Sequence, residues 1–204
     1  MATIKIIDNK ATSNRVMIGE NTLDFMSLQN GLDDDGKAVI MDEAMHVLGQ
    51  CIRPGINDNI TNIAVGYVQS GKTLSFTTLT ALAADNGWRI VVYLTGTKTN
   101  LREQTSKRLQ KDLDIDNTDT YRMYTDIIDS VSVVNNARNF LKLSDEVLLF
   151  PILKHYKHIS RLANIFTQLR PELDGKGCII IDDEADQSSF NTYAKKNSQS
   201  EEWE

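Results

Sequence analysis

An eight-residue pattern at positions 66–73 has the residue types that hold a phosphate chain. It reads Gly-Tyr-Val-Gln-Ser-Gly-Lys-Thr and matches the phosphate-loop pattern G-x-x-x-x-G-K-[ST] at every defined position. Glycines let the backbone turn so that several N–H groups point at one anion. The N-terminus of a following helix adds a partial positive charge. The residues that we expect to hold the phosphates are Gly66, Gln69, Ser70, Gly71, Lys72 and Thr73.

The last two residues of this pattern have distinct expected roles. Lys72 would reach the β- and γ-phosphates, and the Thr73 hydroxyl would ligate Mg²⁺. The guanine-reading pattern N-K-x-D is absent, because residues 97–100 read Thr-Lys-Thr-Asn and lack the final Asp. A GTPase is therefore disfavoured, and the expected ligand is a nucleoside triphosphate with Mg²⁺.

A run of carboxylates follows the apolar residues 178–181. A nucleoside triphosphatase needs a strand-end Asp near Mg²⁺ and an adjacent group that positions the attacking water. We expect Asp183 to take the metal role and Glu184 to polarise the water, with Lys72 as the third catalytic residue. Alone, such a run is more often a solvated loop or a helix N-terminus. A phosphate loop in the same chain favours the catalytic interpretation.

Short apolar runs alternate with helical patterns from residue 59 onward. The expected strands are residues 60–65, 89–95, 147–153 and 178–181, and the expected helices are residues 72–86, 100–113 and 159–169. Apolar strands that alternate with helices predict an α/β fold with a parallel sheet and helices on both faces. The stretch 115–143 is compatible with either helix or strand.

The first 58 residues have a different pattern. A short strand is expected at residues 3–7, a loop at 30–37, where three aspartates stand in a row, and a helix over 41–52. The predicted division is a small mixed or helical N-terminal region, residues 1–58, of unknown role, and an ATP-binding domain, residues 59–204.

Composition narrows the class of protein. In 204 residues, 41% are hydrophobic and 25% charged, which excludes whole-chain disorder and fibrous folds. No apolar run approaches the ~18 residues that span a membrane, and no signal peptide is visible. The two cysteines lack metal-ligand spacing, which favours a reduced, cytoplasmic setting without a membrane partner. The net charge of −6 excludes a uniformly basic nucleic-acid coat but allows local basic patches.

Residues 183–186, Asp-Glu-Ala-Asp, resemble motif II of superfamily-two helicases, the DEAD motif. Residues 95–104 stand where those proteins carry motif Ia, which touches the nucleic-acid backbone. Several blocks of sequence, in the right order, resemble one branch of these proteins more closely. That branch is the Z-one domain endonuclease family, helicase-like ATPases that are associated with prokaryotic restriction and phage defence. Those blocks are residues 66–73, 94–97, 101–105 with 108–109, and 181–192.

The resemblance implies a RecA-like P-loop lobe. Members of the family continue into a T-A-T-P segment and a second RecA-like lobe, which supplies an arginine finger and half of the nucleic-acid groove, whereas this chain stops at Glu204. The expected function is therefore the ATP-binding N-terminal lobe of a helicase-like, nucleic-acid-dependent ATP hydrolase. This chain alone is expected to bind ATP and hydrolyse it poorly. The implied partners are DNA, the second lobe, and nuclease or other antiviral-defence components.

The resemblance to motif Ia also makes Lys98 and Arg102 candidate contacts for backbone phosphates. A solvated basic surface is the alternative for both. That surface is the favoured interpretation for Lys107 and Lys111, further along the same predicted helix, and for the second basic cluster at residues 154–161.

Two other function classes stay open. The first is a small self-contained P-loop kinase, which the length suits but the carboxylate run does not. The second is a non-catalytic nucleotide switch. Phosphoryl transfer to a nucleoside acceptor would identify the first, and partner binding that follows ATP in a Glu184→Gln variant would identify the second.

Overall fold

The computed structural model describes residues 5–6, 15–65, 72–183 and 185. Its helices are α1 (Glu20–Leu28), α2 (Asp34–Gly49), α3 (Lys72–Asp85), α4 (Thr99–Asp112), α5 (Ser130–Leu143), α6 (Tyr156–Gln168) and α7 (Arg170–Leu173). Its strands are β1 (Lys5–Ile6), β2 (Ala64–Val65), β3 (Trp88–Thr95), β4 (Tyr121–Met123), β5 (Val147–Leu153) and β6 (Gly177–Asp182). None of the helices described is long and apolar enough to cross a membrane.

Four strands form one all-parallel sheet in the order β4-β5-β3-β6. β3 lies between β5 and β6, so that Val91 pairs with Leu149 on one side and with Ile179 on the other. Parallel neighbours need crossover connections, and helices supply them here. Because the four strands run the same way, their carboxyl ends lie at one edge of the sheet.

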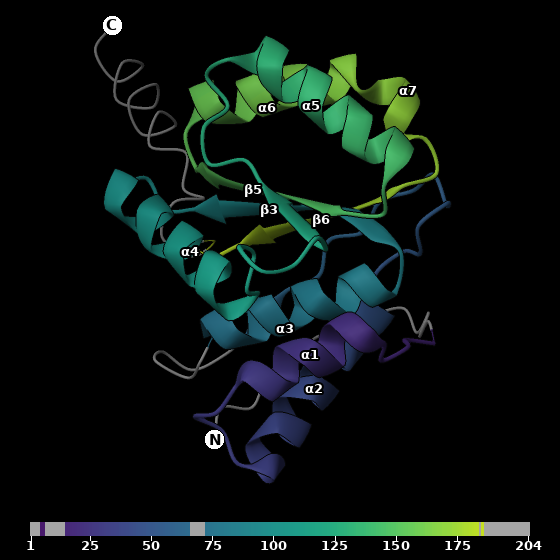
Figure 1. Ribbon diagram of the computed structural model, residues 1–204, viewed down its shortest axis with the longest axis vertical. Coiled ribbons are helices and arrows are strands. Elements are labelled where there is room, and N and C mark those ends of the chain that lie inside the picture. The colour runs from purple at the N-terminus through teal and green to yellow at the C-terminus, as the bar shows by residue number, and fades with distance from the viewer. Residues whose placement is uncertain (1–4, 7–14, 66–71, 184, 186–204) are drawn as a thin grey trace, which may run out of the picture.

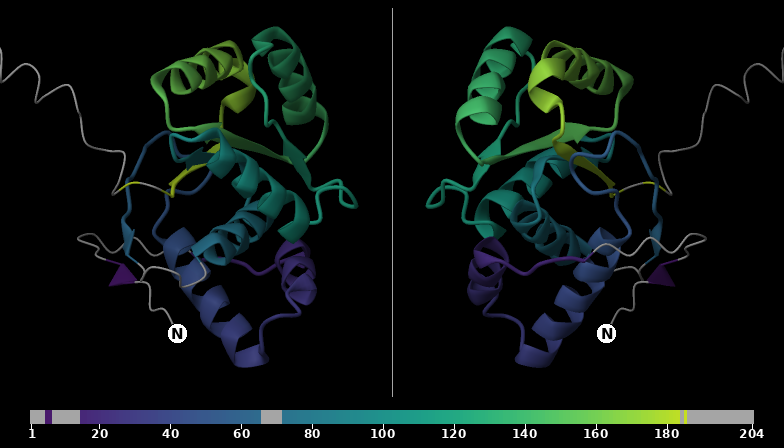
Figure 2. Two further views of the ribbon diagram at one scale, coloured as in Figure 1. Left: turned by 90° about the vertical axis from the view of Figure 1, so that its left-hand side faces the viewer. Right: turned by 90° about the vertical axis from the view of Figure 1, so that its right-hand side faces the viewer.

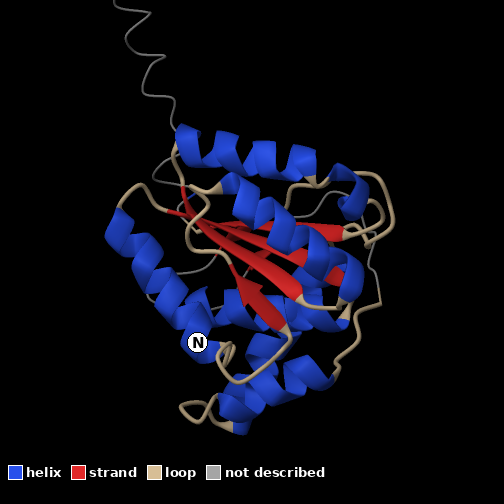
Figure 3. Ribbon diagram, turned by 45° about the horizontal axis from the view of Figure 1, so that its top comes forward, coloured by secondary structure: helices blue, strands red, loops and turns tan. Residues whose placement is uncertain are grey.

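Helices cover both faces of this sheet (Figures 1 and 3). α5, α6 and α7 lie on one face, and α3 and α4 lie on the other. α1 and α2 pack against α3 on its side away from the sheet (Figure 2). The layers bury two apolar cores, one shared by α1–α4 with the sheet and one shared by α5–α7 with its opposite face.

β3 belongs to both cores. Val91 and Tyr93 face the core of α1–α4, whereas Ile90 and Val92 face the core of α5–α7. Each of these four side chains is buried. Burial of one such aliphatic side chain contributes about 1.5–3 kcal/mol. A strand buried on both faces needs a continuous apolar run, and this requirement explains the sequence of β3.

The predicted α/β fold, with a parallel sheet and helices on both faces, is confirmed, as is a helical N-terminal region. β5 has the predicted bounds, β3 and β6 lie within one residue of theirs at each end, and the ambiguous stretch 115–143 contains β4 and α5. Burial of β6 is one-sided, however. Ile179 and Ile181 are buried, whereas the side chain of Ile180 is 62% exposed.

The prediction of a buried strand at residues 60–65 is wrong. Only Ala64–Val65 is a strand, and it pairs antiparallel with β1 outside the main sheet. Ile60 and Ile63 are exposed to 42% and 66%. The apolar residues in this segment are separated by asparagine and threonine, and a pattern so short does not specify which sheet edge a strand joins.

The predicted loop at residues 30–37 is also partly wrong, because α2 begins within it. The Asp33 carboxylate accepts a hydrogen bond from the Gly36 N–H at 2.8 Å and caps the helix. Asp34 and Asp35 form its first turn, where negative charge is stabilised by the helix dipole. The run of three aspartates is therefore a helix start.

Asp85 joins the N-terminal helices to the sheet domain. Its carboxylate accepts hydrogen bonds from the backbone N–H groups of Gly19, Asn21 and Thr22 at 2.9, 3.1 and 3.0 Å, and from both side chains of the last two. α1 has no side-chain cap of its own at Gly19. A carboxylate at the last residue of α3 opposes the dipole of that helix, but here it caps the positive end of α1.

Gly19 is required by this contact. A Cβ atom at position 19 would lie 2.6 Å from Oδ1 of Asp85. The neighbouring Asn86 adds two hydrogen bonds to the backbone of Met17. The end of α3 therefore holds the chain that leads into α1.

We expect Asp85→Ala to lower the free energy of unfolding by about 2–3 kcal/mol, because it leaves donors at the start of α1 without an acceptor. Urea denaturation followed by circular dichroism measures the change. Asp42→Ala, at an exposed carboxylate of α2, is the matched control and should leave stability unchanged within error. Equal stability of the two variants would contradict the capping role.

Candidate functional site

The carboxyl edge of the sheet places Asp182 and Asp183 beside the end of β3. Asp182 pairs in register with Leu94, and the N–H of Asp183 donates to the Leu94 carbonyl at 3.4 Å. The side chain of Asp183 is exposed, and Asp183 lines a small cleft with Phe76 and Thr77 of α3. The predicted metal carboxylate thus lies beside the helix that follows the phosphate-loop pattern.

Lys154 forms an ion pair with Asp182, the first of the two aspartates. Its ammonium group lies 2.7 Å from Oδ2 of Asp182, and both side chains are largely shielded from solvent. The backbone N–H of Lys154 donates to the carbonyls of Thr95 and Gly96 at 2.8 and 3.3 Å, which holds the lysine at the edge. The charge of Asp182 is therefore balanced within the protein, and Asp183 carries the carboxylate that faces solvent.

Several predicted site residues lie outside the described part of the chain. These are Gly66, Gln69, Ser70, Gly71 and Glu184. Lys72 and Thr73 are placed as the first backbone turn of α3, at the position that the phosphate-loop pattern predicts for a helix start. Within the described residues, no group of three or more His, Cys, Asp or Glu side chains is arranged to hold a metal ion.

The buried threonines of α3 have hydrogen-bonded hydroxyls. The hydroxyls of Thr77 and Thr78 both donate to the Leu74 carbonyl, at 3.0 and 2.7 Å, and all three helix threonines from 77 to 80 are buried. The Thr80 hydroxyl also bonds the hydroxyl of Tyr93 on β3. Burial raises the pKa of Tyr93, so this hydroxyl stays protonated. Satisfied hydroxyls allow a β-branched run to form a buried helix.

The two predicted phosphate contacts lie on α4 in different environments. Lys98 is the exposed N-cap residue of this helix. Arg102 is half-buried and faces a cavity. Lys107 and Lys111 are exposed further along α4, as expected for a solvated basic surface.

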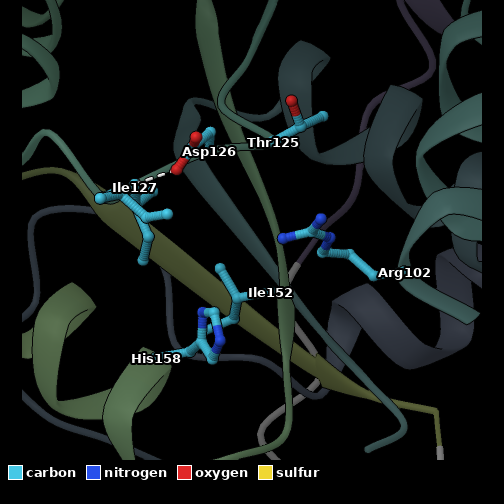
Figure 4. A pocket seen from close by; sticks show the side chains of 7 residues that line it. Arg102, Thr125, Asp126, Ile127, Ile152 and His158 are labelled. Atoms are coloured by element: carbon cyan, nitrogen blue, oxygen red, sulfur yellow. Dashed lines mark hydrogen bonds between the residues drawn. The ribbon is translucent and has the colours of Figure 1, made fainter. Parts of the chain in front are cut away.

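A cavity of about 150 Å³ lies between α4, the loop after β4, and α6 (Figure 4). The side chains labelled there are Arg102, Thr125, Asp126, Ile127, Ile152 and His158. Arg102 from α4 and His158 from α6 lie on either side of Ile152, the penultimate residue of β5. The carboxyl ends of β4 and β5 thus open into a cavity with the Arg102 guanidinium on one wall and the His158 imidazole on another.

His158 lies in a cationic environment. Partial burial lowers the pKa of its imidazole, and the charges of Arg161, Arg102 and His155 lower it further, while Asp126 acts in the opposite direction. His155 is the N-cap of α6, and its Nδ1 accepts a hydrogen bond from the Lys157 N–H at 3.3 Å. Three residues of the basic cluster at 154–161 therefore have different positions. Lys154 pairs with Asp182, His155 caps α6, and His158 lines the cavity.

Two features of the site were not predicted. The Lys154–Asp182 pair has a signal in the sequence, since both residues directly follow predicted strands and parallel strands end at one edge. Thr125 and Asp126 lie in a loop after a strand of only three residues, and no pattern marks them.

Comparison with known proteins yields no relative. The chain matches no protein-family model, no curated protein and no solved structure. The geometry at the carboxyl edge, together with the sequence patterns, therefore carries the functional argument.

The ion pair between Lys154 and Asp182 predicts a measurable coupling. In a double-mutant cycle with Lys154→Met and Asp182→Asn, we expect each single change to lower the free energy of unfolding by about 1–3 kcal/mol, with a coupling of about 1–2 kcal/mol, because each leaves a shielded partner unpaired. Asp145→Asn is the control, since the side chain of Asp145 is fully exposed in its pair with Arg89, and stability should not change. A coupling of zero would contradict the role of the pair.

Proposed function

We propose that this chain is the ATP-binding lobe of a P-loop ATPase and that its parallel sheet is that of a RecA-like lobe. One observation carries the proposal. A complete phosphate-loop pattern leads directly into α3, and α3 shares a cleft with Asp183 at the end of β6. A phosphate-binding pattern at the start of a helix and a carboxylate beside that helix are the two parts that phosphoryl chemistry requires.

Each residue of the proposed site has a role in the charge balance. Backbone N–H groups of residues 66–71 and the Lys72 ammonium would neutralise the phosphates, and Thr73 and Asp183 would hold Mg²⁺. The position of Asp183 supports this choice of ligand, because Asp183 is exposed and lines the cleft beside α3, whereas Asp182 pairs with Lys154. Bound Mg²⁺ would supply further neutralisation of phosphate charge. Glu184 would orient and polarise the attacking water.

The basic end of α4 supports a polyanionic partner. Lys98 and Arg102 lie on the helix that follows β3, at the same edge of the sheet as Asp183. We propose that this edge contacts the backbone of a nucleic acid, with DNA as the expected polynucleotide. The resemblance to the Z-one domain endonuclease family extends the proposal to a helicase-like motor of prokaryotic restriction or phage defence, completed by a second lobe and nuclease components.

The nucleotide half of the proposal is tested by ATP binding. We expect the purified chain to bind a fluorescent ATP analogue in the presence of Mg²⁺, and Lys72→Ala to weaken binding at least about tenfold, since a charge-assisted contact contributes roughly 1.5–3 kcal/mol. Fluorescence titration measures the dissociation constants. Lys107→Ala, at an exposed position of α4, is the control and should bind like the parent chain. Equal binding by the Lys72 and Lys107 variants would overturn the proposed site.

Glu184 is tested by separating binding from hydrolysis. We expect Glu184→Gln to retain the parent affinity for ATP while single-turnover hydrolysis falls, because the amide still hydrogen-bonds but no longer polarises water. The parent chain itself should turn over slowly, since an arginine finger is worth about 10³–10⁵ in rate in related phosphoryl transfer. Fast hydrolysis by this chain alone, stimulated by nucleic acid, would contradict the expectation that a second lobe is needed.

A further inference from the structure

The cavity between α4 and α6 contains a cation that has no partner among the described residues. Arg102 is half-buried, and no hydrogen bond or ion pair joins its guanidinium to another described side chain. A guanidinium partly removed from water without a counter-ion is unfavourable. None of the ion pairs that join two described residues includes Arg102.

The opposite wall of the cavity can become cationic. His158 faces the cavity across Ile152 from Arg102 (Figure 4), and Arg161 and His155 act on it from α6 and its N-cap. Among the described residues, the carboxylate that acts on His158 is that of Asp126, which also lines the cavity. Oδ1 of Asp126 accepts the Ile128 N–H at 2.8 Å, so this carboxylate is held by its own loop. Positive charge therefore outweighs negative charge around the imidazole.

We propose that this cavity binds one phosphodiester group of a nucleic-acid backbone between Arg102 and His158, and that binding draws a proton onto His158. The proposal rests on the nucleic-acid partner proposed above and adds a second ligand residue and a dependence on pH. A volume of about 150 Å³ accepts a phosphate group but not a whole nucleotide. The apolar side chains of Ile127 and Ile152 beside the two cations lower the local dielectric and strengthen the contact.

The direction of the pH effect follows from linkage. Partial burial, and after it the charges of Arg161, Arg102 and His155, hold the pKa of His158 below its usual value of about 6.5, so the neutral imidazole is favoured at neutral pH. An anion between His158 and Arg102 favours the protonated imidazole and raises this pKa. Affinity therefore rises as the pH falls through the bound-state pKa and levels off below the free-state pKa. A phosphodiester keeps one negative charge over this range, so the change in affinity reports the protein.

The test is binding of a short oligothymidylate labelled with tetramethylrhodamine, a dye that does not titrate between about pH 5.5 and 7.5, at constant ionic strength, followed by fluorescence anisotropy. We expect the parent affinity to increase by about fivefold or more between about pH 7.5 and pH 5.5, since one linked proton changes binding by at most about tenfold per pH unit. His158→Gln should bind with little pH dependence. Arg102→Gln should weaken binding at both pH values.

Two control variants separate the cavity from the general basic surface. His155→Asn keeps an N-cap acceptor for α6, and it should retain most of the pH dependence. Lys107→Gln removes an exposed charge from α4 and should lower affinity by a similar, small factor at both pH values. Thermal melts of each variant establish that the fold is intact.

The outcomes are distinct. A parent affinity that does not change with pH, or an equal pH dependence in His158→Gln, would overturn the proton linkage. Oligonucleotide binding that is unaffected by Arg102→Gln would overturn the cavity as the site. ATP binding is measured in the same preparations. If oligonucleotide binding fails the test while ATP binding still depends on Lys72, only the cavity site is overturned. If ATP binding does not depend on Lys72, the proposed ATPase function is overturned.

Discussion

Because β3 is paired along both edges and buried on both faces, the positions of the other elements depend on it. Its neighbours β5 and β6 pair with it on either side. In the chain, α3 comes directly before β3 and α4 directly after it. The Thr95 hydroxyl donates to the Ile152 carbonyl at 3.0 Å, and the Thr95 carbonyl accepts the Lys154 N–H. These bonds join the last residues of β3 and β5. The carboxyl edge is thereby a rigid support for side chains that come from three strands.

Charge is divided along this edge. Asp182 and Lys154 neutralise each other at its centre. Asp183 lines a cleft with residues of α3 and α4, whereas Arg102 and His158 line the cavity between α4 and α6. An acidic position and a basic cavity thus coexist a short distance apart in a chain of net charge −6. The neutral pair between them limits direct cancellation of the two.

Periodicity predicted the elements that are buried and repeat regularly, and this is why the bounds of β5 and the alternation of strand and helix are right. Elements set by distant contacts could not be predicted in this way. α1 is capped by Asp85, more than sixty residues further along the chain, and local sequence around Gly19 has no sign of it. β4 has three residues, too few for a pattern. The segment 60–65 has a strand-like composition, but its pairing partner is decided by the tertiary fold.

The candidate site likewise has residues that the sequence could predict and residues that it could not. Motif patterns identified Asp183 and Arg102, and the structure places one in a cleft beside α3 and the other in a cavity. The roles of Lys154 and His158 depend on which strand ends and helices lie together in the fold. The spacing of residues along the chain does not carry this information. The phosphate-loop residues 66–71 and Glu184 stay predictions, because they lie outside the described residues.

The contact between Asp85 and α1 has a practical consequence for dissecting this chain by truncation. Phe25, Ala44 and Leu48 belong to the same apolar core as Leu82 and Tyr93. A shortened chain that begins near residue 59 would expose this side of α3 to water and leave a half-buried carboxylate at its end with no donors. The N-terminal helices are therefore part of the folding unit, and limited proteolysis should find its first stable boundary before Gly19.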